Sequence, residues 1–143
     1  MLLLSSTTIV SESCLTVLLA DDHHRVLDSA AKMVSSGYRI VATVHDGLTA
    51  LEVARELNPD LIVLDIAMPG MDGIHAAQEM RRLGLQSKII FLTVHNDQDY
   101  IAAARTCGNG YVLKSRMGSD LRRAIEDAFS GRFFVSRRIL EEG

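Results

Sequence analysis

The feature that most restricts how this chain can fold is a regular alternation of short apolar runs with helical patterns. Five such runs lie at residues 15–20, 40–44, 61–65, 88–93 and 110–113. A pattern with apolar residues on one helix face follows each run. Strands that alternate with helices form βαβ units, and right-handed crossovers place helices on both faces of the resulting parallel sheet. The sequence therefore predicts a doubly wound α/β fold with five strands and five helices.

Residues at the ends of the helical patterns support these boundaries. Asp46, Asp72 and Ser119 precede the second, third and last helical patterns, so we expect each to cap a helix N-terminus. Gly37 follows the first helical pattern, and we expect it to close that helix in the left-handed conformation.

The composition fits one globular domain. The chain has 143 residues, of which 48% are apolar and 23% charged, which suits a single core. The net charge of −3 argues against a strongly basic nucleic-acid surface. Two cysteines, Cys14 and Cys107, exclude a disulfide-rich scaffold and favour a reducing compartment, so we expect a cytoplasmic protein. No apolar run is long enough to span a bilayer, and we expect no membrane partner.

We expect three segments along the chain. Residues 1–14 have the character of a leader, which begins apolar but lacks the basic lead-in of a signal peptide. Residues 15–131 hold all the predicted strands and helices and form the domain. Residues 132–143 are basic and are expected to be a linker.

Chemically active side chains collect at the carboxyl ends of the predicted strands. Asp21 and Asp22 follow the first strand, Asp65 the third, Thr93 the fourth and Lys114 the fifth. Ligands of open parallel sheets bind at this edge. Three carboxylates at one edge repel one another, and their hard oxygen atoms favour Mg²⁺ as the compensating cation. The set therefore indicates a phosphoryl-transfer site with a carboxylate nucleophile.

Each of these residues also has a simpler explanation. A single Asp after a strand is usually a turn residue, a lone Lys a solvated charge, and a Thr in a strand a matter of β propensity. Only their coincidence at four strand ends favours the functional interpretation.

The motifs resemble the receiver domain of two-component response regulators. The segments 17–23, 61–73, 90–94 and 110–114 carry the resemblance, which covers nearly all of residues 15–131. It implies a flavodoxin-like (CheY-like) sheet with strand order 2-1-3-4-5. The details resemble the NarL/FixJ (LuxR-type) branch, whose receivers usually precede a helix-turn-helix DNA-binding domain.

The resemblance implies a role for each residue of the acidic site. Asp65 would accept a phosphoryl group from a sensor histidine kinase. Asp22, Asp65 and the backbone carbonyl of Ala67 would hold Mg²⁺, with Mn²⁺ as a substitute, and Asp21 would assist through water. Thr93 and Lys114 would bind the phosphoryl oxygens.

The same resemblance assigns residues that respond to phosphorylation. Thr93 and Tyr111 would form the switch, in which the ring moves inward. Without the resemblance, Tyr111 would be interpreted as an edge-strand aromatic with its hydroxyl in water. Ala67 and His95 lie two residues past Asp65 and Thr93, and we expect their side chains to tune the phosphoryl lifetime. The adjacent His23 and His24 invite a metal-ligand interpretation, which we discount because they lack helical i, i+4 spacing.

Receivers of this type act as switches and not as enzymes on outside substrates. The resemblance implies dimerisation on phosphorylation and DNA contact only through an output domain, which residues 132–143 would lead toward. A hydrolase of similar chemistry needs a second acid two residues after its nucleophile, where this chain has Ala67. A flavodoxin-like cofactor binder needs a Ser-, Thr- and Gly-rich first loop, whereas residues 21–25 are acidic and basic. A receiver that acts only as an interaction module, without phosphorylation, stays open.

Overall fold

A six-stranded parallel sheet forms the centre of the protein, in the order β2-β1-β3-β4-β5-β6. The computed structural model describes residues 14–137. The strands are β1 (Leu15–Ala20), β2 (Tyr38–Val44), β3 (Leu61–Leu64), β4 (Lys88–Thr93), β5 (Gly110–Leu113) and β6 (Phe134–Val135). The predicted order of the first five strands is confirmed, and the sixth strand is an addition.

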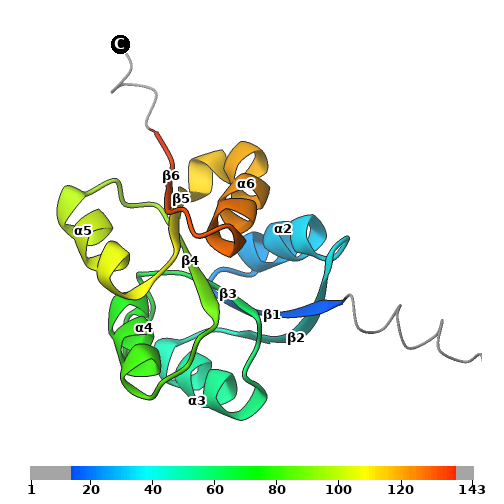
Figure 1. Cartoon of the computed structure of the whole chain (residues 1–143), viewed down its shortest axis with the longest axis vertical. Helices are drawn as coiled ribbons and strands as arrows, with labels where there is room; N and C mark the ends of the chain where they lie inside the picture. The colour runs from blue at the N-terminus through cyan, green and yellow to red at the C-terminus, as the bar shows by residue number, and fades with distance from the viewer. Residues whose placement is uncertain (1–13, 138–143) are drawn as a thin grey trace, which may run out of the picture.

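Five helices cover the two faces of this sheet. They are α2 (His24–Val34), α3 (Gly47–Leu57), α4 (Gly73–Arg82), α5 (Gln98–Cys107) and α6 (Met117–Phe129), with a 3₁₀ turn, η1 (Lys114–Arg116), before α6. Figure 1 shows α2 and α6 on one face and α3, α4 and α5 on the other. Within residues 14–137, no helix has the length and apolar character needed to cross a membrane.

The apolar run of β3 explains why the sheet sits between two helical layers. Ile62 and Leu64 lie in the core under α3, α4 and α5, whereas Leu61 and Val63 lie in the core under α2 and α6. All four side chains are buried. Successive residues of a strand point to opposite faces, so an unbroken apolar run requires cover on both sides.

Two of the four predicted helix-end residues are confirmed as N-caps, and two expectations are wrong. The side chains of Asp46 and Asp72 accept hydrogen bonds from the backbone N–H of the third residue beyond each. Gly37 does not adopt the left-handed conformation, because α2 ends at a right-handed Ser35. Ser119 does not cap α6, because η1 leads directly into a helix that begins at Met117.

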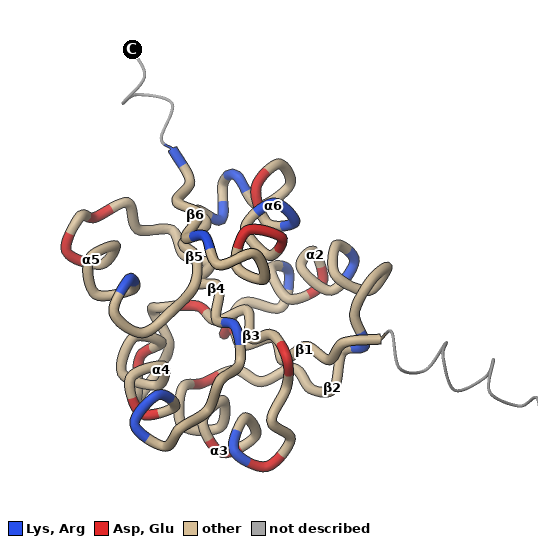
Figure 2. The backbone as a smooth tube through the Cα atoms, in the orientation of Figure 1, with Lys and Arg blue, Asp and Glu red and all other residues tan. Residues whose placement is uncertain are grey.

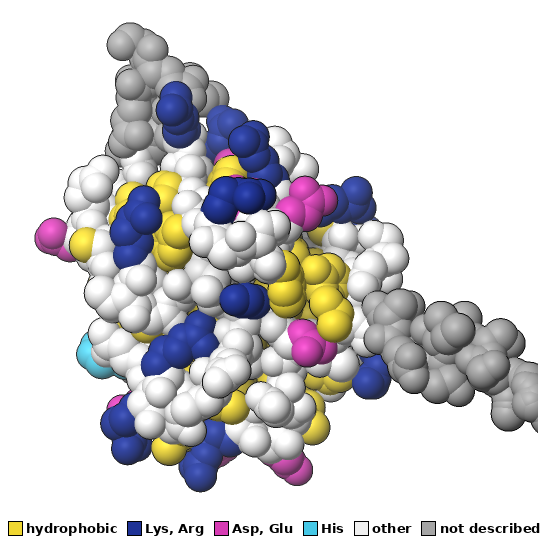
Figure 3. Space-filling model, viewed as in Figure 1, with side chains coloured by type: hydrophobic (Ala, Val, Ile, Leu, Met, Phe, Trp, Pro, Cys, Tyr) yellow, Lys and Arg dark blue, Asp and Glu magenta, His cyan; other side chains and the backbone are white. Residues whose placement is uncertain are grey.

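Two residues of the segment predicted as a linker, residues 132–143, are part of the sheet, and residues 138–143 lie outside the described residues. Phe134–Val135 pairs with Gly110–Tyr111 in parallel register, so β5 is an inner strand and not the flank that we expected. Figure 2 shows basic residues on α6 and near β6, together with acidic residues of α6. Their side chains gather over the same elements on the surface shown in Figure 3.

Candidate functional site

The carboxyl ends of four adjacent strands bring the predicted site residues to one edge of the sheet. Asp21 follows β1, Asp65 follows β3, Thr93 ends β4, and Lys114 follows β5. Asp21, Asp65 and Thr93 are buried. The strand order β1-β3-β4-β5 places these ends side by side, as the sequence predicted.

Backbone contacts hold the two buried carboxylates in place. The N–H of Asp65 donates to the carbonyl of Ala20 at 2.9 Å, and the N–H of Asp21 donates to the carbonyl of Val44 at 3.0 Å. Gly73, the first residue of α4, packs against the backbone of Asp65, where a Cβ would collide with the carbonyl oxygen. No side chain fits at that position, so the glycine allows α4 to begin directly against the loop that carries Asp65.

The ammonium group of Lys114 lies between the two buried carboxylates. Its Nζ is 2.9 Å from Oδ2 of Asp21 and 3.2 Å from Oδ2 of Asp65. Burial alone would lower the pKa of Lys114, but the close contacts with both carboxylates and their negative charges outweigh this effect and raise it. Lys114 is therefore a fixed positive charge at the centre of the site.

Asp65 is the carboxylate whose pKa is most clearly perturbed in the site. Burial and the neighbouring charge of Asp21 raise the pKa of Asp65 to about 6, although Lys114 opposes the rise. Because its ionised form is disfavoured in these surroundings, the Asp65 carboxylate has a strong tendency to bind a compensating positive charge or a proton.

Four residues at this edge could together hold a metal ion. Asp21, Asp22, His23 and Asp65 each offer a ligand atom, and these atoms lie within 4.8 Å of one another. The Oδ2 atoms of Asp21 and Asp65 are buried and accept no well-formed hydrogen bond, although the Lys114 ammonium lies within ion-pair distance. Three carboxylates outnumber the single ammonium. The excess negative charge and the oxygen ligands fit Mg²⁺.

The sequence interpretation did not place His23 in this cluster. Its Nδ1 lies 3.1 Å from Oδ1 of Asp22 and 3.3 Å from Oδ1 of Asp21, while the side chain is 67% exposed. The only sequence signal was its position directly after the acidic pair. The contacts are those of an imidazole with carboxylates, which make the histidine a neighbour of the acidic cluster.

The residues two positions beyond Asp65 and Thr93 differ in their surroundings. Ala67 is exposed, and its N–H lies 3.3 Å from Oδ1 of Asp65. His95 is half-buried, and its N–H donates to Oγ1 of Thr93 at 3.1 Å. The imidazole ring of His95 packs 5.2 Å from the ring of Tyr100.

Tyr111 is fully buried on β5, which contradicts the interpretation of an edge-strand ring with its hydroxyl in water. The hydroxyl donates to the carbonyl oxygen of His95 at 2.6 Å. Burial is the main cause that raises the pKa of Tyr111 to about 12. The backbone of His95 therefore links the Thr93 hydroxyl to the Tyr111 hydroxyl.

Comparisons with known proteins agree with this geometry. The sequence signature of the response regulator receiver domain matches residues 17–126. The nitrate/nitrite response regulator protein NarL of Escherichia coli is 32% identical over 127 residues, which cover 87% of this chain and 59% of NarL. The transcriptional regulatory protein PdtaR of Mycobacterium tuberculosis is 38% identical over 116 residues, covering 80% of this chain and 56% of PdtaR. The chain thus spans less than two thirds of these relatives.

Solved structures give the same result. The crystal structure of a LuxR-family two-component response regulator from Aurantimonas sp. SI85-9A1 matches with a TM-score of 0.82 and 32% identity, covering 91% of this chain and 95% of that one. The isolated receiver domain of RcsB from Salmonella enterica, solved with the phosphomimetic BeF3⁻, matches with a TM-score of 0.78 and 26% identity, covering 87% of this chain and 94% of that one. The chain belongs to the response regulator receiver domain family of two-component systems, and its relatives include NarL and LuxR-family regulators.

Proposed function

We propose that Asp65 accepts a phosphoryl group from a sensor histidine kinase and that this modification switches the output of the protein. The supporting observation is the buried Asp65 carboxylate, 3.2 Å from the Lys114 ammonium within an acidic cluster. An oxygen of the ionised carboxylate attacks phosphorus, and the bond from phosphorus to the donor nitrogen breaks. The electron pair stays on that nitrogen, which takes a proton from solvent.

The acidic cluster would hold Mg²⁺, which supplies positive charge to the phosphoryl oxygens during transfer. Asp22, Asp65 and the backbone carbonyl of Ala67 would bind the ion directly, and Asp21 would assist through water. Mn²⁺ would substitute, since it accepts the same oxygen ligands. The two buried Oδ2 atoms without well-formed hydrogen bonds support this assignment.

Thr93 and Lys114 would bind the phosphoryl oxygens, and Thr93 and Tyr111 would form the switch. Phosphorylation adds about −1.5 to −2 charges and strong hydrogen-bond acceptors at one point. The Thr93 hydroxyl now accepts the N–H of His95, whose carbonyl accepts the Tyr111 hydroxyl. If the Thr93 hydroxyl moves toward the phosphoryl group, the backbone of His95 would shift with it. The hydrogen bond from the Tyr111 hydroxyl to the His95 carbonyl would then change, and with it the position of the ring.

Ala67 and His95 would tune the lifetime of the phosphoryl group. Ala67 is exposed beside Asp65 and has a small side chain, which leaves access for water. The His95 ring is held against Tyr100. Replacing Ala67 with a long polar residue should change the dephosphorylation rate.

The relatives found by sequence and structure comparison suggest the wider role of the protein. We propose a receiver that dimerises on phosphorylation and belongs to a transcription regulator, with residues 132–143 leading toward a helix-turn-helix output domain that contacts DNA. It would act as a switch and not as an enzyme. It would reside in the cytoplasm without membrane contact, where its free cysteines, Cys14 and Cys107, suit a reducing environment.

The intact mass after incubation with Mg²⁺ and a small phosphodonor tests the central proposal. Wild type should gain one phosphoryl group that hydroxylamine and base remove, as expected of an acyl phosphate, and Asp65→Asn should gain none. Asp28→Asn, at an exposed aspartate of α2, is the matched control and should behave as wild type. If wild type gains no mass with several donors, the chain is better explained as a phosphorylation-independent interaction module. A gain in Asp65→Asn would assign the acceptor elsewhere.

A further inference from the structure

The loop that carries Lys114 is bonded to the segment that follows α6. Ser136, directly after β6, donates its N–H to the carbonyl of Tyr111 at 2.9 Å. Its Oγ accepts the N–H of Leu113 at 3.1 Å. The residue before Lys114 therefore has its backbone donor satisfied by a side chain that is more than twenty residues away in sequence.

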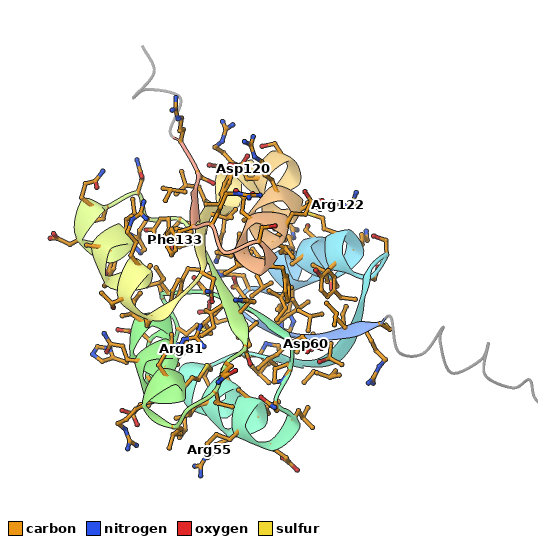
Figure 4. All side chains as sticks on the ribbon, in the orientation of Figure 1. Arg55, Asp60, Arg81, Asp120, Arg122 and Phe133 are labelled. Carbon is orange, nitrogen blue, oxygen red and sulfur yellow. The ribbon has the colours of Figure 1, made fainter. Side chains whose placement is uncertain are left out.

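The same serine is bonded to a buried carboxylate on α6. Oγ of Ser136 donates to Oδ2 of Asp120 at 2.7 Å, and Nε of Arg116 donates to the same oxygen at 3.1 Å. Ser136 and Asp120 are 4% and 7% exposed. Figure 4 shows Asp120 on α6 beside β5 and β6. Although burial alone would raise the pKa of Asp120, hydrogen bonds from Ser136, Ser119 and Arg116 hold it below its usual range.

These contacts hold the chain on both sides of Lys114. Leu113 precedes the lysine and bonds to Ser136, while Arg116 follows it by two residues and bonds to Asp120. Asp120 and Ser136 are also hydrogen-bonded to each other, so the contacts on the two sides of Lys114 belong to one hydrogen-bond network. The Lys114 side chain extends from this braced backbone, and its ammonium group lies within ion-pair distance of Asp21 and Asp65.

We propose that Asp120 and Ser136 are positioning residues for Lys114 in phosphoryl transfer to Asp65. This inference rests on the proposed function. A buried carboxylate network is an inefficient way to gain stability, because desolvation offsets much of its attraction. Its directional bonds instead restrict the backbone from which Lys114 extends. Displacement of a charge-stabilising group by about 1 Å costs up to about a hundred-fold in rate.

The test compares Ser136→Ala and Asp120→Asn with Asp127→Asn. Asp127 also lies on α6 and pairs with an arginine, Arg132, but its partner is 65% exposed and not on η1. The rate of phosphorylation is measured as a function of phosphoramidate concentration with saturating Mg²⁺, which gives the maximal rate and the concentration at half-maximal rate. We expect Ser136→Ala and Asp120→Asn to lower this rate by about three- to ten-fold, the effect of one lost hydrogen bond. In these two variants the phosphoramidate concentration at half-maximal rate should stay unchanged, and Asp127→Asn should match wild type in both quantities.

A second background separates positioning from general stability. If Ser136 acts through Lys114, Ser136→Ala should cause no further loss of rate in a Lys114→Ala protein. An equal loss in both backgrounds would overturn the inference, and so would a wild-type rate in both Ser136→Ala and Asp120→Asn.

The ¹⁵N signal of the Lys114 ammonium decides the point independently of phosphorylation. We expect it to shift or broaden in Ser136→Ala and Asp120→Asn and to stay in place in Asp127→Asn. An unchanged signal in both variants would refute the positioning role. If wild type takes up no phosphoryl group from phosphoramidate although the Lys114 signal shifts in both variants, the proposed function is refuted and the positioning of Lys114 stands.

Discussion

The replacement of Asp65 by asparagine should stabilise the protein in the absence of metal. The folded protein holds this carboxyl at a pKa of about 6 against an ordinary value of 3.8, chiefly because it is buried and faces Asp21. The stability associated with its protonated form is fully present below pH 3.8 and is lost as the pH rises through 6. Asparagine stays neutral at every pH and avoids this loss.

The expected gain is between about 1 and 3 kcal/mol at pH 7.5. One pH unit corresponds to about 1.4 kcal/mol, so the raised pKa of Asp65 amounts to about 3 kcal/mol as an upper value. Solvent screening is small, because the Asp65 side chain is only 2% exposed. The pKa of about 6 already includes the attraction of Lys114 for the ionised Asp65 carboxylate, so this attraction is not subtracted again. The gain falls below the upper value because the asparagine amide is itself a buried polar group with its own desolvation cost.

Urea unfolding with a chelator at pH 7.5 and pH 4 measures this effect. At pH 7.5 the Asp65→Asn protein should be the more stable, and at pH 4 the two proteins should agree within about 0.5 kcal/mol. Asp28→Asn, at an exposed site, should change stability by less than about 0.5 kcal/mol at both pH values. A difference between wild type and Asp65→Asn that is the same at both pH values would refute the electrostatic explanation, as would a less stable variant at pH 7.5.

Three further predictions follow from the structure. Mg²⁺ at about a hundred times its Kd should stabilise wild type by about 2.7 kcal/mol in thermal unfolding, and Asp22→Asn should lose most of this gain. Tyr111→Phe should cost about 0.5–1.5 kcal/mol in urea unfolding, because it removes a buried hydroxyl hydrogen bond. An unchanged stability would show that this bond contributes nothing. Gly73→Ala should cost more than about 2 kcal/mol, since the new Cβ would meet the carbonyl oxygen of Asp65. Gly118→Ala on α6, where the new Cβ would only touch the Met33 side chain at van der Waals distance, should be neutral or stabilising by up to about 1 kcal/mol.

Much of the fold and the site could be predicted because both depend on short-range patterns. The alternation of strands and helices restricts the topology, and residues directly after strands meet at one edge of a parallel sheet. Asp21, Asp65 and Lys114 were therefore predicted to meet, and the structure places them in contact. Asp46 and Asp72 were predicted as caps by the same local logic.

The predictions from the sequence fail where the structure of a segment depends on residues far away along the chain. Phe134–Val135 is too short to carry a strand pattern, and it forms β6 only because β5 offers an unpaired edge. Ser119 has the chemistry of a cap, but η1 starts the helix earlier and directs the serine hydroxyl to Arg116 and Asp120. The alternative interpretation of Tyr111, an edge-strand ring with its hydroxyl in water, is contradicted because the ring is buried and its hydroxyl donates to the His95 carbonyl.

The sequence by itself determined the class of fold, the edge of the sheet where the chemistry collects, and the resemblance to receiver domains. These features depend on residue type and spacing along the chain, which a linear pattern records. Only the tertiary structure decided that the Lys114 ammonium lies between two buried carboxylates, that the Tyr111 hydroxyl meets the His95 carbonyl, and that Ser136 joins Asp120 beside the Lys114 loop. Burial and hydrogen-bond partners arise from residues far apart in sequence, so no local pattern could reveal them.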